Sequence, residues 1–164
     1  MADESLQDST IDKADRGSAK AVLFKIAEVV LAVFSVGLIV DPFNSFQQIF
    51  NKPRTKLDDI AFIYITIGGF VIFNTLFAIS HVLGDRIPKR TTMMFAAVGA
   101  LFHVVAGSVI VHNWRKLHGD YVYVQNNAIY PSKQYMDMLI SGAVFTFLDA
   151  AIFVAEVVFV FKYS

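Results

Sequence analysis

The sequence predicts an all-α membrane protein, a bundle of four transmembrane helices with both termini cytoplasmic. Of its 164 residues, 55% are apolar and only 17% are charged, against about 25% charged residues in an ordinary soluble domain. Four separate apolar segments each approach or exceed the ~20 residues that a helix needs to cross a bilayer. The chain contains no cysteine, which excludes a disulfide framework, a thiolate metal site and a thiol nucleophile.

The chain divides into a polar start and a membrane domain. Residues 1–20 are polar and mixed in charge, so we expect a disordered cytoplasmic tail that cannot bury enough apolar surface to fold. This start lacks the basic and apolar regions of a signal peptide. Residues 21–162 are expected to form the four-helix transmembrane domain. Its spans are predicted at about 21–40, 58–83, 92–112 and 136–161.

The loops predict the orientation. With both termini inside, eight of the 14 basic residues lie on the cytoplasmic side and six lie in the two outer loops. The stronger indication is the short loop GDRIPKR between the second and third spans, which carries three basic residues close to both helix ends. Gly84 and Pro88 mark its turn.

The fourth span carries two carboxylates, Asp149 and Glu156, within the segment LISGAVFTFLDAAIFVAEVVFVFKYS. At the centre of an inserted helix an Asp costs about 2.5–3.5 kcal/mol, while each Leu, Ile, Phe or Val contributes about 0.3–0.6 kcal/mol in the opposite direction. The 14 such residues in 139–161 therefore permit insertion. Gly142, Asp149 and Glu156 repeat every seven residues on one stripe, so we expect both carboxylates to face protein or water.

Depth in the membrane indicates a partner for Glu156. The first span enters from the side on which the fourth leaves, and it carries Lys25 and Glu28 one to two turns from its start. Lys25 and Glu156 are therefore expected to make an intramembrane contact.

The third span provides a partner for Asp149. His103 lies near its midpoint, between Gly99 and Gly107, and this small-polar-small arrangement lets another helix approach closely. His103 and Asp149 are both near the midplane and are expected to meet. These polar contacts are interpreted as fixing packing and register in the bundle. The alternative interpretation is a proton or ion path with Asp149 and Glu156 as relay carboxylates.

The sequence does not indicate a haem site, a catalytic site or a nucleic-acid-binding surface. No two of the four histidines share a depth on facing helices, which argues against a haem held by two imidazoles. Asn74 and His81 are expected to form interface hydrogen bonds or to contact headgroups. We predict no catalytic, cofactor or metal site and no enzyme. The zero net charge and the lack of a long basic run exclude nucleic acid as a partner.

The second outer loop is rich in aromatic residues. Trp114, Tyr121, Tyr123 and Tyr130 are expected at or near the outer headgroups. An aromatic belt and a contact surface for a partner are equally consistent with them. The run YVYV, then QNN, then AIY is typical of a strand, a turn and a returning strand, which favours a hairpin from Tyr121 to Tyr130.

The run GALFHVVAGSVIVHNWRKL at 99–117, followed by a fourth helix with Gly142 and FLDAAIFVAEVVFVFK, resembles the snakeskin family of arthropod four-span membrane proteins over residues 58–162. The resemblance implies a non-enzymatic structural component of smooth septate junctions. It would lie in the lateral plasma membrane of an epithelium and contribute to junction assembly and the paracellular barrier. The implied partners are the lipid bilayer and other junction membrane proteins, and a homo-oligomer stays open.

Two features depart from that family: the longer polar tail and the absence of glycine from the first outer loop. They leave open a MARVEL-type membrane-apposition or trafficking protein. A small transporter, channel or accessory subunit using Asp149 and Glu156 is the other alternative.

Overall fold

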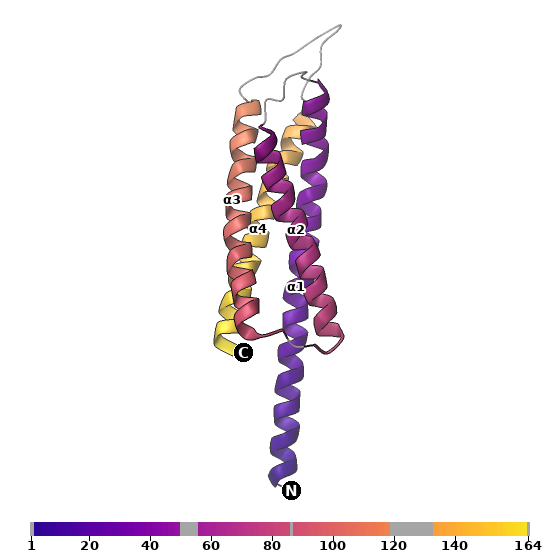
Figure 1. Cartoon of the computed structure of the whole chain (residues 1–164), viewed down its shortest axis with the longest axis vertical. Coiled ribbons are helices and arrows are strands. Elements are labelled where there is room, and N and C mark those ends of the chain that lie inside the picture. Colours follow the sequence, from indigo (N-terminus) through magenta and orange to yellow (C-terminus); the bar gives the residue numbers. More distant parts are fainter. Residues whose placement is uncertain (1, 50–55, 86, 119–132, 164) are drawn as a thin grey trace.

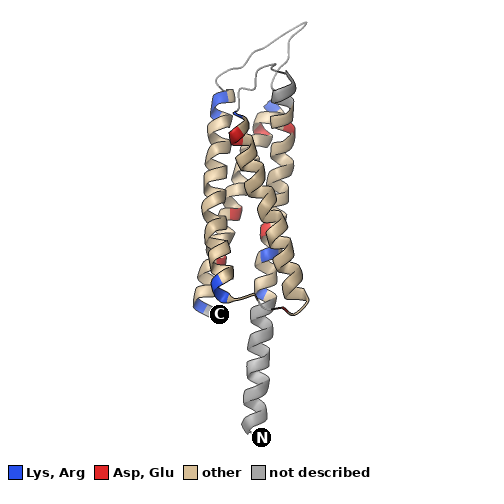
Figure 2. Ribbon diagram, viewed as in Figure 1, with Lys and Arg blue, Asp and Glu red and all other residues tan. Residues whose placement is uncertain are grey.

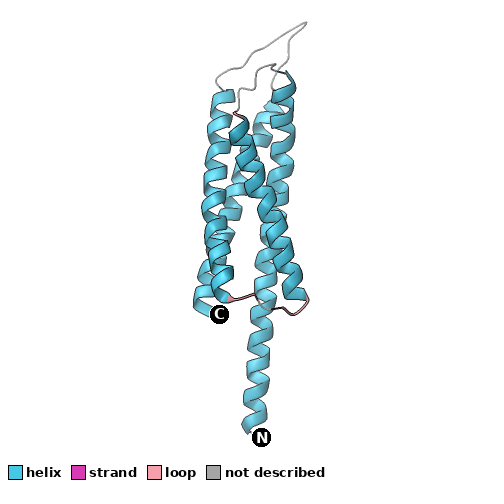
Figure 3. Cartoon of the chain, in the orientation of Figure 1, coloured by secondary structure: helices cyan, strands magenta, loops and turns pink. Residues whose placement is uncertain are grey.

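The described residues form four long α-helices (Figures 1 and 3). The computed structural model describes the backbone of residues 2–49, 56–85, 87–118 and 133–163, and the side chains of residues 19–44, 56–85, 87–117 and 133–162. The helices are α1 (Ala2–Ile49), α2 (Leu57–Val82), α3 (Lys89–His118) and α4 (Lys133–Tyr163). No strand occurs among these described residues. The predicted all-α, four-helix bundle is confirmed.

Each helix contains a stretch long and apolar enough to span a membrane. The four stretches are Ala19–Asn44, Leu57–Val82, Lys89–Leu117 and Lys133–Lys162. Large apolar side chains also cover the outside of the bundle: Ile65 is 74% exposed, Met94 69% and Leu23 66%. An apolar outer surface of this kind is unfavourable in water and favourable against lipid chains. The chain is a multi-pass membrane protein.

Successive helices run antiparallel, so both termini lie at the same end of the bundle (Figure 1). We call this the terminal end, and it also carries the connection from α2 to α3. At the opposite end, the loop end, α1 and α3 finish and α2 and α4 begin. Helix α4 packs against α3 and α1, and α1 also packs against α2. The cytoplasmic orientation of the terminal end stays a prediction, which rests on the distribution of basic residues between the loops.

A glycine turn ends α2 at the terminal end. Gly84 has a φ of 89°, in the left-handed region that glycine enters without the steric cost of a β carbon. The Asp85 N–H then donates to the Ser80 carbonyl at 3.0 Å, which satisfies one of the carbonyl groups left open at a helix end. The turn predicted at Gly84 is present in the structure.

Helix α1 differs from the prediction at both ends. It begins at Ala2, where the sequence predicts a disordered tail over 1–20, and it continues through Pro42 to Ile49, where the sequence predicts a loop. Extending an existing helix requires no new nucleus, and the tail contains good helix formers such as Ala, Glu, Leu, Gln and Lys. Near the loop end, Phe43 is 1% exposed and its ring meets that of Tyr64 edge-on. The packing of Phe43 stabilises this part of the helix by more than the loss of the backbone hydrogen bond that Pro42 cannot donate.

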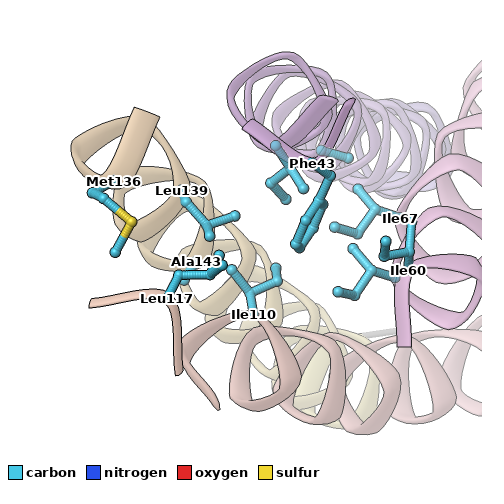
Figure 4. Packing of buried hydrophobic residues seen from close by; sticks show 11 residues of the cluster. Phe43, Ile60, Ile67, Ile110, Leu117, Met136, Leu139 and Ala143 are labelled. Atoms are coloured by element: carbon cyan, nitrogen blue, oxygen red, sulfur yellow. The ribbon is translucent and has the colours of Figure 1, made fainter. Parts of the chain in front are cut away.

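Apolar side chains from all four helices fill the loop-end half of the bundle (Figure 4). We call this cluster the loop-end core. It consists of Ala32, Ile39, Phe43, Ile60, Ile63, Ile67, Ile110, Leu117, Met136, Leu139 and Ala143. Six of its members are 0% exposed: Ala32, Ile39, Ile63, Ile67, Ile110 and Leu139. The buried charged residues of α1, α3 and α4 lie nearer the terminal end than these six, and so does the buried amide of Asn74 on α2. The interior is therefore divided into an apolar half and a polar half.

Candidate functional site

A buried lysine is the centre of the polar half. Lys25 lies three residues before Glu28 on α1, so one helix turn puts both side chains on the inner face. Its Nζ atom donates to Glu28 Oε2 at 2.9 Å, to Glu156 Oε2 of α4 at 2.6 Å and to Asn74 Oδ1 of α2 at 3.4 Å. An ammonium group has three N–H donors, and all three are used. We call these four residues, which join three helices, the Lys25 cluster.

The Lys25 cluster is closed off from solvent. Its four side chains are between 0% and 2% exposed. The rings of Phe77 and Phe153 lie 5.7 Å and 5.5 Å from the Lys25 ammonium, a separation at which an aromatic face attracts a cation. Figure 2 shows a blue band and a red band next to each other in the lower half of the bundle. Because these side chains are almost fully buried, their charges interact more strongly than they would at a protein surface.

His103 of α3 and Asp149 of α4 form a second buried pair. Both side chains are 0% exposed, and His103 Nε2 lies 3.2 Å from Asp149 Oδ2 without the alignment of a hydrogen bond. The other ring nitrogen, Nδ1, lies 2.8 Å from the Gly99 carbonyl oxygen. A carbonyl only accepts hydrogen bonds, so Nδ1 carries a proton. The structure thus brings together both pairs expected from depth, since Lys25 also meets Glu156.

The sequence left the role of Asn74 open between an interface and a headgroup contact. Its side chain is 2% exposed and belongs to the Lys25 cluster. His81, with which it shares a sequence stripe, has a different environment. His81 Nδ1 lies 2.8 Å from the Phe77 carbonyl of its own helix. A seven-residue spacing on α2 therefore did not place the two side chains in one site.

A hydroxyl contact joins α1 and α4 near the middle of the bundle. Ser35 Oγ lies 2.6 Å from Thr146 Oγ1 and donates to the Gly142 carbonyl at 3.0 Å. The close approach depends on Gly142, because a β carbon there would lie 2.6 Å from Ile39 Cγ1. Sequence reasoning missed Thr146. The available signal was its position three residues before Asp149, on the same helix face.

The two glycines that flank His103 make room for aromatic rings. A β carbon at Gly99 would lie 2.8 Å from the ring of Phe153 and 2.9 Å from that of Phe70. A β carbon at Gly107 would lie 2.9 Å from the ring of Phe147. Distances below 3.0 Å require the ring to move, so glycine at both positions permits the close packing of α3 on α4.

The loop-end half contains one further polar contact and two cavities. Asn113, which is 0% exposed, has its Nδ2 3.4 Å from Asp59 Oδ2, a contact that sequence reasoning missed. One cavity, about 370 Å³, is lined by Lys56, Asp59, Val104, Val105, Ser108, Val109, His112 and Lys116. The other, about 570 Å³, is lined by Val40, Phe43, Asn44, Leu57, Ile60, Ala61 and Tyr64. Neither is lined by a residue of the Lys25 cluster or by the His103–Asp149 pair.

The structure describes only one of the four aromatic residues expected on the outer loop. Trp114 lies within α3, half-buried, and packs against the loop-end core. Helix α3 continues to His118, beyond the predicted end of the third span, because this face of its last turns is covered by the core. Tyr121, Tyr123 and Tyr130 lie outside the described residues, and so does the hairpin predicted there.

These contacts hold the four helices in one register. The Lys25 cluster links α1, α2 and α4, and the His103–Asp149 pair links α3 to α4. Polar contacts between membrane helices contribute about 0.6–2 kcal/mol each. Among the described side chains, no group of three or more His, Cys, Asp and Glu residues has the geometry to hold a metal ion.

Asp149→Asn should be tolerated better than Asp149→Leu. An asparagine amide can donate to His103 Nε2 and accept from other donors, whereas leucine leaves Nε2 of the buried imidazole without a partner, at a cost of about 1–3 kcal/mol. The measurement is the free energy of unfolding of each variant in mixed micelles. Equal destabilisation by the two substitutions would contradict a hydrogen-bonding role for this side chain.

Residues 20–163 match the family described as Domain of unknown function (DUF7775). The match covers most of the chain, including the buried residues Lys25, Glu28, His103, Asp149 and Glu156, and the chain belongs to this family. A search of the curated proteins and of the solved structures found no match.

Proposed function

We propose that the protein is a non-enzymatic structural component of an epithelial cell junction, where it contributes to junction assembly and to the paracellular barrier. In this proposal it lies in the lateral plasma membrane beside other junction membrane proteins. The observation that carries the structural role is that each buried charged side chain in the described part of the chain lies against an oppositely charged partner, mostly on another helix. Such contacts favour a rigid bundle that presents its loops in a constant arrangement.

The junction itself is supported by the sequence segment at 99–117 and the fourth helix, which resemble the snakeskin family. The loops between the helices are short, so a contact with a neighbouring membrane would require them to act together or with a partner protein. A rigid four-helix base reduces the entropy lost when these loops bind.

A small transporter or channel is the second candidate. It is favoured by buried carboxylate oxygens that have no hydrogen-bond partner, among them Asp149 Oδ1 and Glu156 Oε1. An ion path across the membrane also requires polar groups or water along its whole length. The loop-end core opposes this, because Ile39, Ile63 and Ile110 are 0% exposed and close the interior on that side. The structural role is therefore the better supported of the two.

Depletion of the protein from an epithelium should raise the leakage of a tracer between cells, and the tagged protein should be concentrated at lateral contacts. The reason is that a missing structural component leaves gaps in the barrier. Re-expression of the native chain should restore the barrier. A Tyr121→Ser/Tyr123→Ser chain, altered only outside the membrane helices, should reach the surface and restore it less well.

Even distribution over the cell surface together with an unchanged barrier would refute the junction proposal. The transport alternative has its own test in liposomes containing the purified protein. An ion flux that Asp149→Asn abolishes would favour it over the structural role.

A further inference from the structure

The Lys25 cluster contains more negative than positive groups. Lys25 provides one ammonium, and the carboxylates of Glu28 and Glu156 lie 2.9 Å and 2.6 Å from it. The second oxygen of each carboxylate, Glu28 Oε1 and Glu156 Oε1, has no hydrogen-bond partner within the described part of the chain. With both carboxylates ionised, the cluster would hold one uncompensated negative charge inside the membrane.

The His103–Asp149 pair needs a proton for a different reason. Nδ1 of His103 is committed to the Gly99 carbonyl at 2.8 Å, so a neutral ring would present the lone pair of Nε2 to Asp149. A lone pair facing an ionised carboxylate 3.2 Å away is repulsive. The contact becomes attractive when one proton lies on Nε2 or on the carboxyl group. In both forms the pair has no net charge.

No other buried charge among the described side chains compensates these groups. The titratable and charged residues that face the polar half are Lys25 and Glu28 from α1, His103 from α3, and Asp149 and Glu156 from α4. Helix α2 provides only the amide of Asn74, whose Nδ2 has no partner among the described atoms although the side chain is 2% exposed. A buried group that lacks a counter-charge is neutralised in preference to remaining ionised, because burial without compensation costs many kcal/mol.

We propose that the folded bundle is a proton-binding protein whose core takes up two protons. One lies on the carboxylates of Glu28 and Glu156 beside Lys25, and the other lies between His103 and Asp149. Each proton is taken up by a carboxylate or by a neutral imidazole next to a carboxylate. With both protons bound, the core is electrically neutral. The loop-end core closes the other half of the interior, so the two protons remain in the polar half.

The number of protons bound can be measured from the pH dependence of unfolding, because stability falls with rising pH wherever the folded state binds more protons than the unfolded state. Unfolded Glu ionises near pH 4.3 and unfolded His loses its proton near pH 6.5. Between about pH 5 and 6 the folded chain holds one extra proton, so the unfolding constant should rise about tenfold per pH unit. Above about pH 7 it holds two, and the rise should be about a hundredfold per unit.

Isosteric variants should each remove one proton from the folded core, and the infrared band of a protonated carboxyl group distinguishes the two variants. Glu28→Gln should remove the dependence between pH 5 and 6 and leave about a tenfold rise per unit above pH 7. Asp149→Asn should show little dependence between pH 5 and 6 and about a tenfold rise per unit above pH 7, because the amide donates to Nε2 and keeps the folded imidazole neutral, while the unfolded His103 still binds a proton below about pH 6.5. Asp58→Asn, at an exposed carboxylate near the start of α2, should behave like the native chain. If Glu28→Gln does not fold, Glu156→Gln tests the same proton beside Lys25.

The measurement is reversible unfolding in mixed micelles from pH 5 to 9 at constant ionic strength, with infrared spectra of the folded protein at pH 7. The spectra should contain a protonated-carboxyl band that weakens in Glu28→Gln. A native chain whose unfolding constant does not rise above pH 7, as expected for the Glu28→Gln/Asp149→Asn double variant, would overturn the proposal. Stability that follows sodium concentration and not pH would also overturn it, in favour of a sodium ion.

Discussion

Lys25→Met should lower the free energy of unfolding by about 3–5 kcal/mol, the largest loss expected from any single substitution in this chain. Methionine fills a similar volume but leaves the carboxylates of Glu28 and Glu156 facing each other without a cation, inside the membrane and 0–1% exposed. Removing one member of a buried ionic group costs more than replacing the whole group. The measurement is unfolding of the purified variant in mixed micelles.

The matched control for Lys25→Met is Lys89→Met, which removes an exposed lysine at the start of α3 and should change stability by less than about 0.5 kcal/mol. Adding Glu28→Gln and Glu156→Gln to Lys25→Met should recover much of the loss, because the core is then uncharged. A single Lys25→Met variant as stable as the native chain would show that the cluster contributes no net interaction.

Gly142→Leu should destabilise the bundle by about 1–3 kcal/mol or more by forcing α1 and α4 apart. A β carbon at this position would lie 2.6 Å from Ile39 Cγ1 and 3.4 Å from the Ser35 carbonyl oxygen, which is backbone and cannot rotate away. The same displacement would break the bond from Ser35 to the Gly142 carbonyl, now 3.0 Å. Unfolding in mixed micelles measures the loss.

Gly37→Leu is the matched control, since a β carbon at Gly37 on the same pair of helices meets nothing within 4 Å. It should be close to neutral in a bilayer, where an added apolar side chain contacts lipid. Combining the smaller change Gly142→Ala with Ile39→Ala should cost less than the sum of the two separate changes, because the truncated side chain removes the clash. Full additivity would mean that the two residues do not interact.

The pairing of Lys25 with Glu156 and of His103 with Asp149 could be predicted from the sequence because antiparallel spans relate position in the chain to depth in the membrane. Asn74 could not be assigned in the same way. Depth places it at the level of the cluster, but whether its amide faces the core or the lipid depends on how α2 is rotated about its own axis. Rotation is set by packing against the other helices, which hydropathy does not report.

Local sequence determined the number of helices, their order and the stripe that bears Asp149 and Glu156, because span length and helical period depend only on residues close together in the chain. Tertiary structure decided the rest. The packing of Phe43 on Tyr64 allows α1 to continue past Pro42. Ser35 and Thr146 come into contact because Gly142 lets α1 and α4 approach closely. The apolar half and the polar half of the interior also exist only in the assembled bundle, because each is built from side chains of several helices whose mutual distances no local pattern specifies.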